Sequence, residues 1–120
     1  MRILVVDDNK QLASTIQYVI ETESPHTVRT AYDGLDGYLV FLHFNPELII
    51  TDINMPRKNG FELMRHARTH NPMVNAIYMS ADQDRFRSLL ELEQDKYHAS
   101  FLSKPFSLSE LLDLLCKDSG

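Results

Sequence analysis

Short apolar runs rich in β-branched residues alternate along this chain with longer segments of helical character, and this alternation constrains the fold more than any other feature. The runs cover residues 3–6, 27–31, 48–51, 76–80 and 100–102. Strands that alternate with helices require a parallel sheet covered on both faces, because each crossover is right-handed and buries one side of a helix. The sequence therefore predicts a doubly wound α/β fold around a five-stranded parallel sheet.

The segments between the runs carry apolar residues three or four positions apart, the spacing typical of helices with one buried side. Start signals support this pattern: Asp8 or Asn9 can cap the first helix, Asp33 the second, and Ser107 to Glu110 reads as a capping box for the last. We expect five helices whose apolar positions are Leu12, Ile16, Val19 and Ile20; Leu35, Tyr38, Leu39 and Leu42; Phe61, Leu63, Met64 and Ala67; Phe86, Leu89 and Leu90; and Leu108, Leu111, Leu112 and Leu115.

Two of these expected helices leave alternatives open. The second is apolar on more than one side, because Val40, Phe41 and Phe44 lie beyond its main stripe. It is either a deeply buried helix or one that presents a contact patch. The third carries His66 and His70 one turn apart, a spacing that could bind a metal. Because no third ligand is close to them in the sequence, we interpret this pair as a solvated helix face.

The size and composition of the chain exclude several classes of protein. Its 120 residues suffice for one domain, and we expect residues 1–120 to form it without an internal boundary. A net charge of −5 argues against direct nucleic-acid binding, and the apolar runs are too short to span a membrane. The N-terminus turns acidic too early for a signal peptide, so we expect a cytoplasmic protein. Cys116 stands alone, which excludes an internal disulfide and a cysteine-based metal site.

Three aspartates follow two of the predicted strands. Asp7 and Asp8 end the first strand, and Asp52 follows the third. In parallel α/β sheets the functional groups gather at the carboxyl ends of the strands, so these carboxylates converge if the first and third strands are neighbours. Two unit charges about 5 Å apart repel by roughly 3 kcal/mol at an effective dielectric near 20. The cluster therefore needs a cation, and its oxygen ligands favour Mg²⁺.

Two further polar groups end strands at the same expected edge of the sheet. Ser80 ends the fourth strand and Lys104 ends the fifth. The formal charges then balance, because three carboxylates face one divalent ion and one lysine. These are the parts that phosphoryl transfer needs, since that chemistry depends mainly on positioning and charge neutralisation.

With these residues in view, the chain resembles a response-regulator receiver domain of two-component signalling, in the CheY-like superfamily. The resemblance covers essentially the whole chain and is carried by "VVDDN", "IITDINMPRKNG", "YMSAD" and "FLSKPFS", in this order. It implies a flavodoxin-like fold with strand order 2-1-3-4-5. It also implies a regulatory phospho-acceptor rather than an enzyme, one that takes a phosphoryl group from a histidine kinase or a histidine phosphotransfer protein.

The resemblance assigns roles to the acidic residues. Asp52 is the phospho-acceptor, and Asp8, Asp52 and the backbone carbonyl of Asn54 ligate Mg²⁺. Asp7 reaches the ion chiefly through water. Asn54, two residues beyond the acceptor, is also a position at which family members tune the lifetime of the phosphoryl group.

The resemblance further assigns roles near the other strand ends. Ser80 and Lys104 hold the phosphoryl oxygens, and the bond from Lys104 to Pro105 is usually cis in the family. Asp82 is a second lifetime-tuning position. Phe101 matches the aromatic switch position, although an aromatic residue there also suits a plain core role.

Partners follow from the same resemblance. We expect a possible output domain after Gly120, and a possible homodimer through the surface made by the fourth helix, fifth strand and fifth helix. That surface would change when the acceptor is phosphorylated, which would control the output domain or a partner.

Two other functions compete with this one. A haloacid-dehalogenase-type hydrolase also begins with a strand-end aspartate, but it needs a second aspartate two residues later, where this chain has Asn54. A pseudo-receiver that only binds partners would lack the acceptor or the acidic pair, and both are present. The chain also departs from the family: Lys58 and Asn59 replace an apolar residue and an aspartate, while Gly60 is kept, and the turn at 97–101 lacks its usual glycine.

Overall fold

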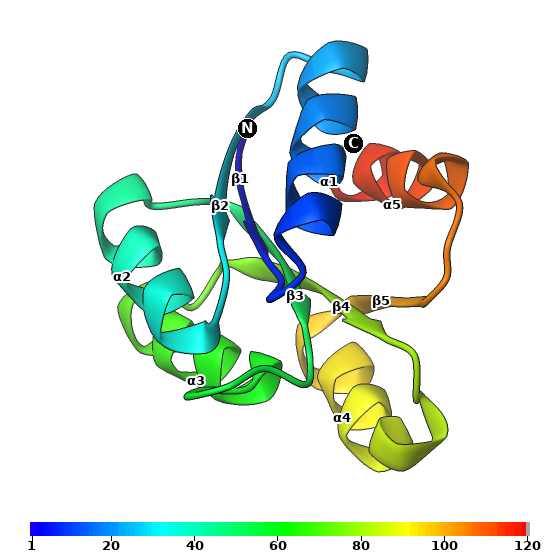
Figure 1. The fold of residues 1–120 in the computed structure, drawn as a ribbon. Helices are drawn as coiled ribbons and strands as arrows, with labels where there is room; N and C mark the ends of the chain where they lie inside the picture. Colours follow the sequence, from blue (N-terminus) through cyan, green and yellow to red (C-terminus); the bar gives the residue numbers. More distant parts are fainter. Residues whose placement is uncertain (120) are drawn as a thin grey trace.

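One parallel sheet organises the computed structural model, which describes the backbone of residues 1–119 and the side chains of residues 1–116. Its strands lie in the order β2-β1-β3-β4-β5, so the predicted α/β fold and strand order are confirmed (Figure 1). The five strands are β1 (Arg2–Val6), β2 (Thr27–Ala31), β3 (Leu48–Asp52), β4 (Asn75–Ser80) and β5 (Ser100–Ser103).

Helices cover both faces of the sheet, with α1 and α5 on one face and α2, α3 and α4 on the other (Figure 1). Asn9 rather than Asp8 caps α1, while Asp33 caps α2 and the box of Ser107 and Glu110 opens α5 as predicted. The helices are α1 (Lys10–Glu23), α2 (Gly34–Phe44), α3 (Gly60–His70), α4 (Arg87–Tyr97) and α5 (Leu108–Ser119), with a short 3₁₀ turn, η1 (Asp84–Phe86), before α4.

The central strands β1, β3 and β4 are buried on both faces, which is why they read as continuous apolar runs. In β1, Ile3 and Val5 pack with the helices α1 and α5, whereas Leu4 and Val6 pack with α2, α3 and α4. All four side chains are fully buried. In the part of the chain that the structure describes, no helix is both long enough and apolar enough to cross a membrane.

Helix α2 turns a different side inward from the one that its leucines suggest. Its buried residues are Gly34, Gly37 and Phe41, while Leu39 and Leu42 are 48% and 45% exposed. A Cβ added at Gly37 would lie 3.0 Å from a methyl carbon of Val6, so this glycine lets the helix approach the sheet closely. The predicted core stripe of leucines is therefore wrong: Phe41, which lies beyond that stripe, faces the core, while Leu39 and Leu42 are exposed.

Helices α2 and α3 meet through aromatic and histidine side chains. The Tyr38 hydroxyl lies 2.6 Å from His70 Nε2, and the Tyr38 ring packs edge-on against His66. His70 is exposed and His66 is half-buried, so the pair forms a partly solvated helix face that also contacts α2 through Tyr38.

The register of the sheet brings the functional strand ends to one edge. Val6 pairs with Thr51, Asp52 with Met79, and Ser80 with Ser103. Because all neighbouring strands are parallel, the residues that follow β1, β3, β4 and β5 emerge side by side.

Candidate functional site

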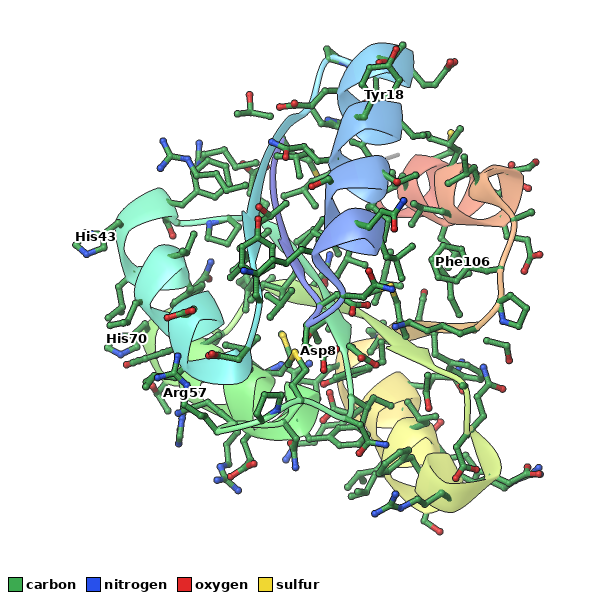
Figure 2. The ribbon with its side chains drawn as sticks, in the orientation of Figure 1. Asp8, Tyr18, His43, Arg57, His70 and Phe106 are labelled. Carbon is green, nitrogen blue, oxygen red and sulfur yellow. The ribbon has the colours of Figure 1, made fainter. Side chains whose placement is uncertain are left out.

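The three aspartates converge at this edge. Asp7 is fully buried, Asp52 is 9% exposed, and Asp8 faces solvent. One carboxylate oxygen from each lies within 4.8 Å of the others. Figure 2 shows Asp8 at the end of β1, beside the end of β3. The structure thus brings together the cluster that the sequence predicted from two separate strand ends.

Lys104 faces this cluster from the end of β5. Its Nζ lies 2.7 Å from an oxygen of Asp7 and 3.5 Å from an oxygen of Asp52. Burial by itself lowers the pKa of Lys104, but the hydrogen bond to Asp7 and the charges of both aspartates outweigh burial and raise it. The lysine is therefore a fixed cation beside the carboxylates. The Lys104–Pro105 peptide bond is cis, the geometry that the resemblance implies.

Asp52 is the carboxylate whose titration is most perturbed. Burial raises the pKa of Asp52 to about 6; Lys104 opposes this rise, while Asp7 and Asp8 add to it. Without a further cation, a substantial fraction of Asp52 is protonated in weakly acidic solution. A positive ion at this place would return the side chain to its nucleophilic, ionised form.

Both oxygens of Asp7 are already engaged. One accepts from the backbone N–H of Asn9 at 2.9 Å, and the other accepts from Lys104. Asp8 and Asp52 leave more of their ligand capacity open at the surface of the site. Three carboxylates and one lysine carry a formal charge of −2, and hard oxygen donors suit a divalent ion. The residues present therefore fit the Mg²⁺ that the resemblance implies.

Ser80, Asp82 and Phe101 lie around the neighbouring strand ends. Ser80 is 4% exposed, and its hydroxyl oxygen accepts from the backbone N–H of Asp82 at 2.9 Å. Asp82 and Asn54 are both exposed. Phe101 is half-buried on β5 and lines a hollow of about 230 Å³ with Leu90 of α4. Space for a rearrangement thus exists next to the expected switch residue.

The loop that follows Asp52 is held against α2 by Arg57, to which the sequence assigns no role, and by Asp33, which the sequence predicts only as a helix cap. Arg57 Nε and Nη2 donate to one oxygen of Asp33 at 3.0 and 2.6 Å, and Nη2 also reaches Asp36 at 3.3 Å. Figure 2 shows Arg57 beside α2. A Cβ at Gly34 would lie 1.9 Å from the carbonyl oxygen of Lys58, so only glycine permits this approach.

The backbone at Arg57 is itself unusual. Its φ is 71°, and the N–H of Lys58 donates to the carbonyl of Pro56 at 2.8 Å, which closes a three-residue turn. A residue with a side chain is strained in this conformation and needs its surroundings to hold it there. No glycine marks the turn, and Asp33 is distant in sequence, so spacing alone gave no signal for this clamp.

Removing the clamp should weaken Mg²⁺ binding. Arg57→Gly keeps the positive φ without strain but loses the contact with Asp33, so the loop that carries the Asn54 carbonyl becomes less fixed. We expect a loss of about three- to tenfold in Mg²⁺ affinity, less than the loss of about 10–100-fold typical when a residue bonded to a metal ligand is removed. Isothermal titration with MgCl₂ measures it.

A matched variant controls for the helix cap. Asp33→Asn keeps a good N-cap for α2 but loses the charge that Arg57 contacts, so it should weaken Mg²⁺ binding in the same way. Unchanged affinity in both Arg57→Gly and Asp33→Asn would contradict the role of the clamp.

Comparisons with known proteins agree with this geometry. A family model described as "Response regulator receiver domain" matches residues 3–116. The transcriptional regulatory protein DltR of Streptococcus agalactiae is 31% identical over 114 residues, which cover 93% of this chain and 49% of that protein. The chain spans about half of the length of the curated relatives that it matches.

Solved structures show the same likeness. The receiver domain of Francisella response regulator 1452 has a TM-score of 0.78 and 28% identity, and the match covers 99% of this chain and 98% of that one. The chemotaxis protein CheY4 of Vibrio cholerae has a TM-score of 0.83 at 24% identity, with 97% and 96% covered, which supports the fold.

The acidic cluster and its lysine occupy the sheet edge of a fold shared with receiver domains, and the family model spans nearly all of the chain. The chain therefore belongs to the response regulator receiver domains, the regulatory phospho-acceptors of two-component signalling.

Proposed function

We propose that Asp52 accepts a phosphoryl group from the phosphohistidine of a sensor kinase or a phosphotransfer protein, and that this modification controls an output domain or partner. The observation that carries the proposal is the position of Asp52, which shares the sheet edge with Asp7, Asp8 and Lys104. We place the domain in the cytoplasm, where such donors act on it.

In the transfer, a carboxylate oxygen of Asp52 attacks phosphorus in line and the bond from phosphorus to the histidine nitrogen breaks. Lys104 neutralises part of the charge on the transferred oxygens. Asp8, Asp52 and the carbonyl of Asn54 would hold Mg²⁺, with Asp7 acting through water. When bound, Mg²⁺ supplies charge neutralisation for the carboxylate and phosphoryl oxygens.

The product is an acyl phosphate, which water attacks to restore the carboxylate. Asn54 and Asp82 are exposed beside the acceptor, where they can orient or obstruct that water. We assign both residues to the lifetime of the phosphoryl group rather than to its formation.

Phosphorylation would act on partners by shifting the surface formed by α4, β5 and α5. Ser80 would turn its hydroxyl from the N–H of Asp82 toward a phosphoryl oxygen, which frees space beneath α4. Phe101 would rotate into that space from β5. The hollow between Phe101 and Leu90 supports this step, and the two arrangements need differ by only a few kcal/mol. An output domain after Gly120, or a second copy of the chain, would bind the shifted surface.

A protein donor is supported by an apolar hollow beside the site. It measures about 350 Å³ and is lined by Leu12 of α1 together with Pro105, Phe106 and Leu108 after β5. A small donor such as acetyl phosphate does not need an apolar surface of this kind, whereas a helix that carries phosphohistidine can pack on it. Figure 2 shows Phe106 between β5 and α5.

The test uses acetyl phosphate and MgCl₂. We expect one added phosphoryl mass by mass spectrometry, which hydroxylamine removes because it cleaves acyl phosphates. Asp52→Asn should reduce the yield by more than about 100-fold, since an amide is not a nucleophile for this step.

Asp95→Asn is the matched control, because it removes an exposed carboxylate of α4 that has no role in the site and should leave the added mass intact. An unchanged yield in Asp52→Asn would refute the assignment. A hydrolase of the dehalogenase type would instead turn over many equivalents of acetyl phosphate without accumulating the added mass.

A further inference from the structure

A groove lies between α3 and α4, away from the acceptor cluster. It encloses about 320 Å³ and is lined by Phe61, Arg65 and Arg68 of α3 and by Leu89, Leu92 and Lys96 of α4, among others. We call it the α3–α4 groove. Leu89, which the sequence analysis placed on an apolar stripe, is 48% exposed, and Leu92 is 56% exposed. These leucines lie three residues apart, so α4 presents them together along the groove.

The groove carries positive charge on a chain whose net charge is −5. Arg65 and Lys96 are exposed along it. Among its described lining residues, Glu93 is the only carboxylate. That carboxylate already forms an ion pair with Arg68 Nη1 at 2.9 Å and accepts a hydrogen bond from the hydroxyl of Tyr78. The charges of Arg65 and Lys96 are therefore not balanced within the groove.

Arg68 adds a second observation that points to an anionic ligand. Its side chain is only 10% exposed, and its guanidinium carbon lies 3.6 Å from the centre of the Tyr97 ring. Its Nε and Nη2 are buried and have no hydrogen-bond partner among the described residues. Buried donors without acceptors are costly and uncommon in folded proteins. Arg68 thus holds two donors behind the wall of the groove, which an incoming acceptor reaches when the side chain turns from Tyr97.

We propose that the α3–α4 groove binds an acidic amphipathic helix of a partner protein. Its apolar side would lie on Leu89, Leu92 and Phe61, as in other complexes where a helix packs in a groove. Its carboxylates would pair with Arg65 and Lys96, and one would reach Arg68 as that side chain turns from Tyr97. The complementary charge selects an acidic segment over a basic one.

Binding in this groove would also be linked to phosphorylation. Glu93 joins α4 to β4 through Tyr78 and to α3 through Arg68, so a helix in the groove contacts the element that the proposed switch moves. This linkage rests on the proposed function. It must be reciprocal: phosphorylation would change the affinity for the helix by the same factor by which the bound helix changes the phosphorylation equilibrium. The binding itself does not depend on Asp52. Asp52→Asn should therefore still bind the helix even if it cannot be phosphorylated.

The probe is a fluorescein-labelled helical peptide of about 15 residues, with leucine on one side and glutamate on the other. Fluorescence anisotropy at low salt should show saturable binding to the domain. The double variant Arg65→Glu and Lys96→Glu should weaken it at least about tenfold, and so should Leu89→Ser with Leu92→Ser. A peptide with lysine in place of glutamate should not bind.

Matched controls come from other surfaces of the chain. Leu39 and Leu42 of α2 have the same spacing and similar exposure, so Leu39→Ser with Leu42→Ser should leave binding unchanged. The pair Arg29→Glu and Lys10→Glu controls for net charge, because Arg29 lies on the far edge strand β2 and Lys10 lies in α1 on the other side of the sheet. Thermal melting checks that each variant is folded. Absence of binding by the glutamate peptide would overturn the proposal, as would equal loss of binding in the groove variants and in the matched controls.

Discussion

Replacing Lys104 with methionine should lower the free energy of unfolding by about 3–5 kcal/mol at pH 7, because the change leaves a buried carboxylate without its cation. Asp7 is fully buried, and the ammonium group 2.7 Å away is the only cation that contacts it among the described residues. Methionine has nearly the same length as lysine, so packing is largely kept. Urea denaturation followed by circular dichroism measures the change.

A second substitution separates lost charge pairing from lost packing. Adding Asp7→Asn to Lys104→Met removes the unpaired charge, so the double variant should recover a large part of the lost free energy. The deficit of the single variant should also shrink at acidic pH, because uptake of a proton by Asp52 lowers the repulsion within the cluster. If Asp7→Asn restored nothing and pH had no influence, the ion pair would not be the source of the destabilisation.

Asp52→Asn should increase the free energy of unfolding by about 1–3 kcal/mol at pH 7.5 in the absence of Mg²⁺. Burial raises the pKa of Asp52 from 3.8 to about 6, so the folded state binds this proton more tightly than the unfolded state does. The corresponding stability is fully present below the unfolded pKa and is lost as pH rises through about 6. Asparagine stays neutral and avoids that loss, which amounts to about 1.4 kcal/mol per pKa unit before solvent screening.

The comparison needs a pH series and a metal series. Near pH 4 wild type and Asp52→Asn should differ little, and the gap should open between pH 4 and 6. Mg²⁺ should close it by stabilising wild type, by about 2.7 kcal/mol at a concentration 100 times its Kd. Asp8→Ala should relieve repulsion without Mg²⁺ and lose the Mg²⁺ response. A gap that is constant with pH, or a wild type insensitive to Mg²⁺, would contradict this account.

The elements of the sheet could be predicted closely because burial on both faces leaves a clear sequence signal. The third strand runs one residue further than expected, since Asp52 pairs with Met79 before the chain turns. Helix α2 could not be oriented from its leucines. The orientation of α2 is set by Gly37, because the absence of a side chain there allows the helix to approach Val6 closely. The spacing of apolar residues does not reveal this, because glycine has no apolar side chain.

The acidic cluster could be predicted because strand ends of a parallel sheet must meet. The clamp by Arg57 could not, because it depends on a positive φ without glycine and on a partner 24 residues away. His98 likewise ends α4 with a φ of 59°, a conformation that glycine usually marks. Such positions depend on tertiary contacts, which local propensity does not encode.

The ion pair between Asp7 and Lys104 joins residues that are 97 positions apart. Ribosomes make proteins from the N-terminus and domains generally fold as units, so Asp7 cannot be buried beside its cation until β5 has been made. A chain that ends before β5 would have to bury Asp7 without a cation, which opposes folding of the first four strands alone. The ion pair therefore couples the burial of the end of the first strand to the arrival of the last strand of the sheet.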